Sequence, residues 1–264
     1  MFFNNSTDSL FFSVPELVNL VTNELCYRDL MALSKLSVVC ARSAQRQLFR
    51  VVHVVVPPND DADDTLCDGE LVLRNPALAA HVRVLEIRPK YMWALTDVVS
   101  FAFLSRVLAA CPAVVELRLE SVHWYSEPDA AVPPLDCSVG RSLTRLHLTN
   151  VKTFRGSPLE LLWTDRRWSE LTVSGCELQI LHTDTSVPPS AVLRPLDQLT
   201  VCWFGRLQSS RLDPVDRVAL LPLSRKLTVT YDKRTTHDLT YVIDVVKPLL
   251  HCLRVEALWH HSSK

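Results

Sequence analysis

Histidine and cysteine, the residues that most often carry chemistry, are plentiful in this chain but are not spaced as catalytic or metal-binding motifs. The 264 residues include nine histidines and eight cysteines. The adjacent pairs His251-Cys252 and His260-His261 have no second pair at the spacing of zinc ligands. The chain has no C-x-x-C, G-x-S-x-G or H-E-x-x-H sequence, and its five glycines form no phosphate-binding loop. We therefore expect no catalytic residue, no metal and no cofactor, and hence a protein that is not an enzyme.

Composition and charge are those of an ordinary globular protein. The chain is 48% hydrophobic and carries 28 basic against 29 acidic residues, which leaves no basic excess for nucleic-acid phosphates. Its first residues, MFFNNSTDSLFF, lack the basic start of a secretory signal, and no run approaches the ~18 apolar residues of a membrane span. We expect a cytoplasmic or nuclear protein that binds neither nucleic acid nor membrane, with reduced and mostly buried cysteines.

Three short helices, each apolar on one side, are expected in the first fifty residues. Ser13 and Glu16 have the spacing of a capping box, and Pro15 falls in the first turn, where its missing N–H does no harm. Asp29 is expected to cap a second helix, and a third is expected from about Val38 to Leu48. A unit this small is marginal alone, so its apolar faces must pack on the rest of the chain or on a partner protein.

The stretch VPELVNLVTNELCYRDLMALSKLSVVC resembles an F-box, and the next residues, ARSAQRQLFRVV, are similar to the segment that comes after that motif in many fungal F-box proteins. The family pattern is roughly Leu-Pro-x-x-Leu, an apolar helix, a later Asp-Leu and then Val-Cys. The matching residues are Pro15, Leu17, Val21, Leu25, Asp29, Leu30, Leu33, Val39 and Cys40. Two positions depart from the pattern: Val14 replaces the usual Leu, and Ser43 stands where Trp is common.

The resemblance implies docking onto the Skp adaptor, and through it onto a cullin scaffold, in a Skp–cullin–F-box ubiquitin ligase. The expected adaptor-binding residues are Pro15, Leu17, Leu20, Val21, Leu25, Leu30 and Leu33. The alternative is an unrelated helical hairpin that caps the following domain. Burial separates the two, because a capping hairpin packs Leu17, Val21 and Leu25 entirely within the chain.

An apolar-x-x-apolar-x-apolar pattern recurs along the rest of the chain. Its copies are Val51/Val54/Val56, Val82/Leu85/Ile87, Val114/Leu117/Leu119, Leu143/Leu146/Leu148, Trp168/Leu171/Val173, Leu196/Leu199/Val201, Leu227/Val229 and Leu250/Leu253/Val255. Their middle residues are 25 to 32 positions apart. The pattern resembles irregular leucine-rich repeats, in which each copy supplies a short strand and stacked copies share one core. The alternative is a compact sheet protein with coincidental spacing.

These patterns predict an α/β protein with two parts. Residues 1–50 are expected to form a three-helix F-box, and residues 51–264 an irregular leucine-rich-repeat solenoid. Leu95 to Ala110 is expected to be one helix, apolar around much of its circumference and enclosed by other elements. The acidic run from Asp60 to Asp64 is expected to be a solvated loop.

Side chains between the apolar positions of each strand are expected to point away from the core, because side chains alternate along a strand. Stacked strands would align them as one mixed-charge surface for a protein substrate. The residues we assign to substrate binding are Glu86, Arg88, Glu116, Arg118, Arg145, His147, Glu170 and Arg254. The alternative is a merely solvated face. The expected function is therefore substrate recognition in a ubiquitin ligase, and the alternative is a repeat-based binding module with no ubiquitin role.

Overall fold

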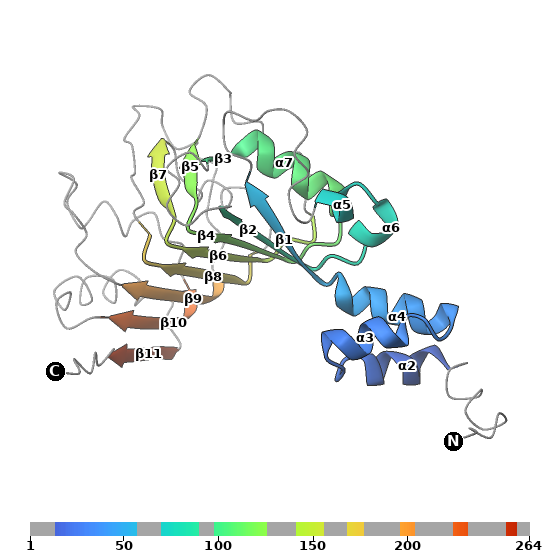
Figure 1. Cartoon of the computed structure of the whole chain (residues 1–264). Helices are drawn as coiled ribbons and strands as arrows, with labels where there is room; N and C mark the ends of the chain where they lie inside the picture. The colour runs from blue at the N-terminus through green and yellow to red at the C-terminus, as the bar shows by residue number, and fades with distance from the viewer. Residues whose placement is uncertain are drawn as a thin grey trace, which may run out of the picture.

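Helices gather at the start of the chain, and parallel strands follow with further helices among them (Figure 1). The computed structural model describes residues 14–56, 70–89, 98–125, 141–155, 168–176, 196–203, 224–231 and 252–257. The helices are α2 (Pro15–Thr22), α3 (Tyr27–Leu33), α4 (Val38–Leu48), α5 (Glu70–Leu73), α6 (Pro76–Ala79) and α7 (Phe101–Ala110). The strands are β1 (Val51–Val56), β2 (Val84–Pro89), β3 (Val98–Ser100), β4 (Glu116–Glu120), β5 (His123–Tyr125), β6 (Arg145–Thr149), β7 (Lys152–Arg155), β8 (Glu170–Ser174), β9 (Leu196–Trp203), β10 (Ser224–Tyr231) and β11 (Cys252–Ala257).

The three predicted N-terminal helices are present, with two differences at their caps. Helix α2 begins at Pro15 with Val14 as N-cap and no side-chain cap, and the predicted cap Ser13 lies outside the described residues. The predicted cap at Asp29 is wrong: the N-cap of α3 is Cys26, whose Sγ donates to Asp29 Oδ2 at 3.1 Å. Asp29 lies in the first turn instead, where a negative charge is stabilised by the helix dipole.

Helix α4 has the predicted bounds, and α2 and α3 both pack against it. Ser37 caps it by accepting a hydrogen bond from the backbone N–H of Cys40. The side chain of Ser43 is small and buried, and its hydroxyl donates to Asn19 Oδ1 on α2 at 2.7 Å. The buried side chains between these helices are Val18, Thr22, Leu30, Cys40, Ser43 and Ala44. We call α2, α3 and α4 the helical unit.

The main sheet has eight strands in the order β1-β2-β4-β6-β8-β9-β10-β11. Every neighbouring pair is parallel and follows the order of the chain (Figure 1). Each copy of the predicted pattern contributes one strand, and the middle residues of seven copies lie in register: Leu85, Leu117, Leu146, Leu171, Leu199, Leu227 and Leu253. The spacing of apolar positions therefore placed these strands correctly.

The first strand has a different register from the predicted one. Val52, not Val54, lies opposite Leu85, so the predicted alignment of Val51/Val54/Val56 is wrong by two residues. The segment VVHVVV offers valine at almost every position, so the apolar pattern alone does not choose the register. Pairing with β2 buries Val52, Val54 and Val56 and turns His53 to the opposite face.

A second, three-stranded sheet of β3, β5 and β7 lies beside the main sheet. The single helix predicted from Leu95 to Ala110 is therefore wrong in its first part, because residues 98–100 form β3 and α7 begins only at Phe101. The Ser100 hydroxyl accepts a hydrogen bond from the backbone N–H of Phe103 at 3.1 Å and caps that helix. Leu104 and Leu108 are buried, but the opposite side of α7 is exposed, so the predicted enclosure all round is wrong. Residues 95–97 lie outside the described ranges.

Tight turns follow three successive strands at the same position of each copy. Ser121, Asn150 and Gly175 have positive φ angles of 54°, 52° and 61°. The backbone N–H of Ser121 donates to Thr149 O, and that of Asn150 to Ser174 O, each at 2.8 Å. A Cβ atom at Gly175 would collide with the Asn150 side-chain oxygen. Glycine fits this turn because it has no Cβ to strain or clash.

The hydrophobic core of the sheet is one continuous cluster running from Val52 to Leu199. It includes no residue of the helical unit. Helix α4 ends at Leu48 and β1 begins at Val51. The division into an F-box at residues 1–50 and a leucine-rich-repeat domain at residues 51–264 stays a prediction. In the described ranges, no helix has the length and apolar character to cross a membrane.

Candidate functional site

The side chains that could bind a metal or act as nucleophiles do not form a reaction centre in the described part of the chain. Among the described residues, no group of three or more His, Cys, Asp or Glu side chains gathers where it could hold a metal ion. Burial raises the pKa of the Cys111 thiol to about 11 and that of Cys176 to about 11. Both thiols therefore stay protonated at neutral pH and are poor nucleophiles. Cys26 and Cys252 are exposed, so the prediction of mostly buried cysteines is only partly met.

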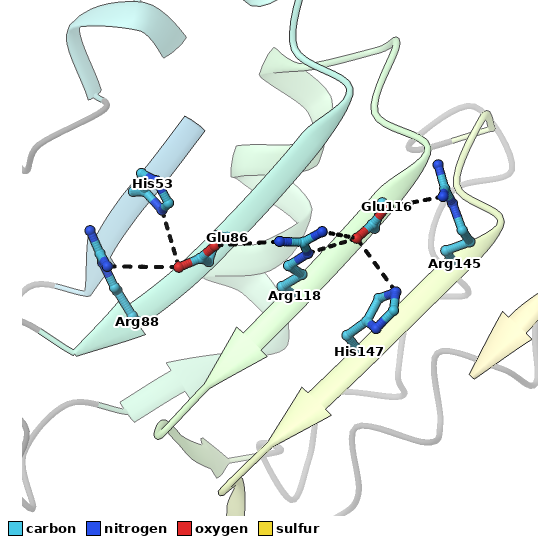
Figure 2. Close-up of polar contacts among 7 residues, drawn as sticks. All are labelled: His53, Glu86, Arg88, Glu116, Arg118, Arg145 and His147. Atoms are coloured by element: carbon cyan, nitrogen blue, oxygen red, sulfur yellow. Dashed lines mark hydrogen bonds and ion pairs between the residues drawn. The ribbon is translucent and has the colours of Figure 1, made fainter. Parts of the chain in front are cut away.

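A row of glutamate, arginine and histidine side chains crosses the outer face of the main sheet (Figure 2). His53, Glu86, Arg118 and His147 lie directly opposite one another on β1, β2, β4 and β6. Neighbouring strands are about 4.8 Å apart, so each of these side chains reaches the next. We call this set the polar row; its members are His53, Glu86, Arg88, Glu116, Arg118, Arg145 and His147.

Two glutamates hold the polar row together. The carboxylate of Glu86 lies 3.1 Å from His53 Nδ1, 3.7 Å from a guanidinium nitrogen of Arg88 and 4.0 Å from one of Arg118. Glutamate Glu116 lies 2.6 Å from Arg118, 3.3 Å from Arg145 and 3.4 Å from His147 Nε2 (Figure 2). Arg118 therefore bridges the two carboxylates.

The acids and the cations of the polar row differ in exposure. The side chains of Glu86 and Glu116 are only 12% and 5% exposed, whereas those of Arg88, Arg118 and Arg145 are 40–47% exposed. Both glutamates point away from the core, as predicted, but the neighbouring cations cover them. What reaches the solvent is a set of guanidinium groups held in place by carboxylates beneath them. Such forks suit carboxylate or phosphate groups and aromatic faces of a partner.

Six of the eight residues predicted for substrate binding meet in the polar row. Of the other two, Glu170 on β8 lies opposite Arg145 and is half-buried. Arg254 is exposed on β11, and the hydroxyl residues Thr172, Thr200 and Thr228 lie between it and the polar row in the same register. Arg254 is thus three strands beyond β8, and it belongs to a different part of the face.

His53 is the member of the polar row that the sequence pattern missed. No residue of the first copy, Val51/Val54/Val56, was included in the predicted set, although His53 comes before the middle residue Val54 as Glu116 comes before Leu117. The signal that would have found it is the period of two in Val52, His53 and Val54, with one polar side chain between two apolar ones.

His147 is neutral at physiological pH despite its contact with a carboxylate. Burial lowers its pKa from 6.5, and this effect exceeds the opposing influence of Glu116 and Glu170. Arg118 and Arg145 lower the pKa further. The neutral ring can still donate a hydrogen from Nε2 toward Glu116.

This lowered pKa predicts a pH dependence of stability. Between pH 6.5 and the lower folded-state pKa, the unfolded chain binds a proton at His147 that the folded chain does not. The free energy of unfolding should therefore fall as the pH drops below 6.5, and the fall should stop below the folded-state pKa. Urea denaturation of wild type and His147→Gln between neutral pH and about pH 5 checks this. A variant with the same pH slope as wild type would contradict it.

The helical unit presents a second, apolar surface. Leu17, Leu20 and Val21 on α2 are 41%, 64% and 39% exposed. We call the exposed apolar side chains of the unit the apolar helical surface; they are Val14, Leu17, Leu20, Val21, Tyr27, Met31, Leu36 and Val38. Isolated exposed leucines are common, but eight large apolar side chains on so small a unit are typical of an interaction site.

The predicted adaptor-binding residues differ in their accessibility. Pro15, Leu17, Leu20 and Val21 are exposed, and Leu25 and Leu33 are half-buried. Leu30 is only 6% exposed. It packs inside the helical unit and is the least accessible of the predicted adaptor-binding residues.

Comparison with protein-family models finds no match for this chain, and comparison with curated proteins finds none either.

Proposed function

We propose that this chain is a substrate-recognition subunit of a Skp–cullin–F-box ubiquitin ligase. The helical unit would act as an F-box that binds the Skp adaptor, and the strands would be leucine-rich repeats that hold a protein substrate. One observation carries the proposal: the helical unit has an interior of its own, yet Leu17, Leu20 and Val21 remain exposed. Covering such side chains contributes about 25 cal/mol per Å² of apolar surface removed from water.

Burial within the chain speaks against a mere cap on the sheet. In that alternative, Leu17, Val21 and Leu25 would pack entirely against the first strands. Leu17 and Val21 are exposed and Leu25 is half-buried, while the core of the sheet begins at Val52 and includes none of them. The helical unit therefore has an apolar side to offer to another protein.

The proposed mechanism is proximity. The adaptor and cullin would bring a ubiquitin-loaded enzyme to the substrate that the sheet holds, and so raise the effective concentration of the reacting groups. No catalytic residue is required of this chain. The guanidinium groups of Arg88, Arg118 and Arg145 would contribute directional contacts to the substrate.

A pull-down of the purified chain with a Skp adaptor tests the proposal. Wild type should bind, and Leu20→Asp should abolish binding, because it places an unpaired charge in an apolar contact at a cost of about 2 kcal/mol or more. Leu20 is 64% exposed, so the variant should remain folded by circular dichroism. Ala77→Asp is the matched control, because it adds the same charge at an exposed site on α6.

Each outcome has a distinct meaning. Binding by Leu20→Asp equal to that of wild type would remove Leu20 from the docking face. A folded wild-type chain that fails to bind would overturn the ubiquitin proposal and favour a repeat-based binding module.

A further inference from the structure

A stretch of the chain around α4 is basic and has no acidic residue to balance it. Residues 30–59 contain no Asp or Glu, but they contain Lys35, Arg42, Arg46 and Arg50. Arg42 and Arg46 are one helical turn apart on α4, and Arg50 comes directly after its C-cap. All three arginine side chains are exposed. The net charge of the whole chain is −1, but this part of it carries a basic surface.

The first strands of the sheet extend this basic surface. The backbone oxygen of Arg50 accepts hydrogen bonds from the N–H groups of Arg83 and Val84 at 2.9 and 3.0 Å, so Arg50 and Arg83 lie side by side. Arg83 is also exposed. One guanidinium nitrogen of Arg83 donates to the carbonyl oxygens of Ala80 and Ala113 at 3.2 and 3.1 Å, which holds the side chain in place without neutralising its charge. We call Arg42, Arg46, Arg50 and Arg83 the arginine stripe.

These arginines differ from those of the polar row in what surrounds them. Arg88, Arg118 and Arg145 each have a carboxylate within 4.0 Å. Within the described part of the chain, the arginine stripe takes part in no ion pair.

The positive charge of the arginine stripe affects the pKa of the half-buried His81. Its pKa is lowered by burial first, and then by the positive charges of Arg46 and Arg83. Arg46 on α4 and Arg83, the residue directly before β2, therefore act on the same imidazole.

We propose that the arginine stripe binds an acidic segment of a partner protein, one with several Asp or Glu side chains. Guanidinium groups one helical turn apart, about 5.4 Å, can each pair with a separate carboxylate of an extended peptide. The partner would supply the negative charge that residues 30–59 lack. No residue of the stripe belongs to the apolar helical surface or to the polar row, and the inference holds whether or not the chain joins a ubiquitin ligase.

A protein partner fits better than a nucleic acid. From Arg42 to Arg50 the stripe extends only about 12 Å, which is enough for a few phosphates but not for the six to ten contacts typical of strong nucleic-acid binding. The rest of the chain adds no net positive charge to strengthen such binding. A short acidic peptide needs only the local surface.

Fluorescence anisotropy with a labelled 12-residue polyglutamate peptide as probe tests the inference. The wild-type chain should bind it, and the triple variant Arg42→Gln, Arg46→Gln, Arg50→Gln should bind about tenfold more weakly, since each exposed pair contributes modestly. The matched control replaces three exposed cations outside residues 30–59, Arg28→Gln, Arg106→Gln and Arg225→Gln, and so changes the net charge equally. The control should bind within about twofold of wild type.

NMR titration of His81 adds a local readout. Peptide on the stripe should raise the pKa of His81, because carboxylates next to Arg46 and Arg83 offset the repulsion that those arginines exert. Three results would overturn the inference. The pKa of His81 could stay unchanged, the control variant could lose as much peptide affinity as the stripe variant, or the stripe variant could lose none. Tighter, stripe-dependent binding of a 12-nucleotide single-stranded DNA would also overturn it and indicate a nucleic-acid surface. Arg42→Gln alone gives a smaller version of the same test if the triple variant fails to fold.

Discussion

Leu146→Ala should lower the free energy of unfolding by about 3 to 4 kcal/mol. Leu146 lies on β6 in the middle of the main sheet, opposite Leu117 on one side and Leu171 on the other, and all three are 0% exposed. Truncation removes apolar contacts and leaves a cavity that neighbouring strands cannot close without disturbing their hydrogen-bonded register. Urea denaturation followed by circular dichroism measures the change.

Leu36→Ala is the matched control for this substitution. The same atoms are removed, but Leu36 is 63% exposed, so the free energy of unfolding should change by about 0.5 kcal/mol or less. A similar small loss at Leu146 would mean that the core is loosely packed and that the register of apolar residues does not stabilise the sheet.

Glu116→Gln is expected to lower the free energy of unfolding by about 2 kcal/mol. The amide keeps the size of the side chain but loses the charge that Arg118, Arg145 and His147 approach. Charged hydrogen bonds are lost, and a buried carboxylate is replaced by an amide with donors facing cations. The two arginines are 40–45% exposed and can turn toward water, which limits the loss.

Glu120→Gln on the same strand is the control, because Glu120 is exposed and should tolerate the change within about 0.5 kcal/mol. A double-mutant cycle with Arg145→Gln isolates the pair of Glu116 and Arg145 and should give a positive coupling energy. A Glu116→Gln loss as small as that of Glu120→Gln would show that solvent compensates fully and that the polar row does not stabilise the fold.

The two expected losses have different consequences for function. Leu146→Ala should weaken binding at every surface of the protein to the same extent, because it acts by unfolding the chain. Glu116→Gln should instead disturb the positions of Arg118 and Arg145, so it should weaken proposed substrate binding even at temperatures where the protein is folded. Adaptor binding by the helical unit should be unaffected, because Glu116 lies on the sheet.

Periodic apolar residues in the sequence were enough to place most strands of the main sheet. Leu85, Leu117, Leu146 and Leu171 occupy equivalent positions because a strand buries every second side chain and one shared core demands the same phase in each. The third helix was equally accessible from the sequence, since its start depends on a local cap, Ser37, and its length on its own apolar spacing.

The sequence did not determine the structure where several neighbouring residues could occupy the same position in a strand or a helix cap. Valine at almost every position of VVHVVV left the register of β1 undetermined by the sequence, and pairing with β2 sets it. Likewise, Cys26 and Asp29 both lie near the start of α3, and the cap is the residue whose backbone is extended there, Cys26.

Side-chain environment in the polar row was decided only by the tertiary structure. Alternation placed Glu86 and Glu116 on the outer face, as it did Arg88 and Arg118, and nothing local distinguishes acid from base there. The glutamates are covered partly by arginines two positions along the same strand, Arg88 beside Glu86 and Arg118 beside Glu116. The other contacts come from neighbouring strands, from residues 29 to 33 positions away in the chain that only the sheet register brings close. Burial of a charge depends on partners brought by the register, so the sequence alone determined which residues share the face, and the assembled sheet determined which of them a partner can reach.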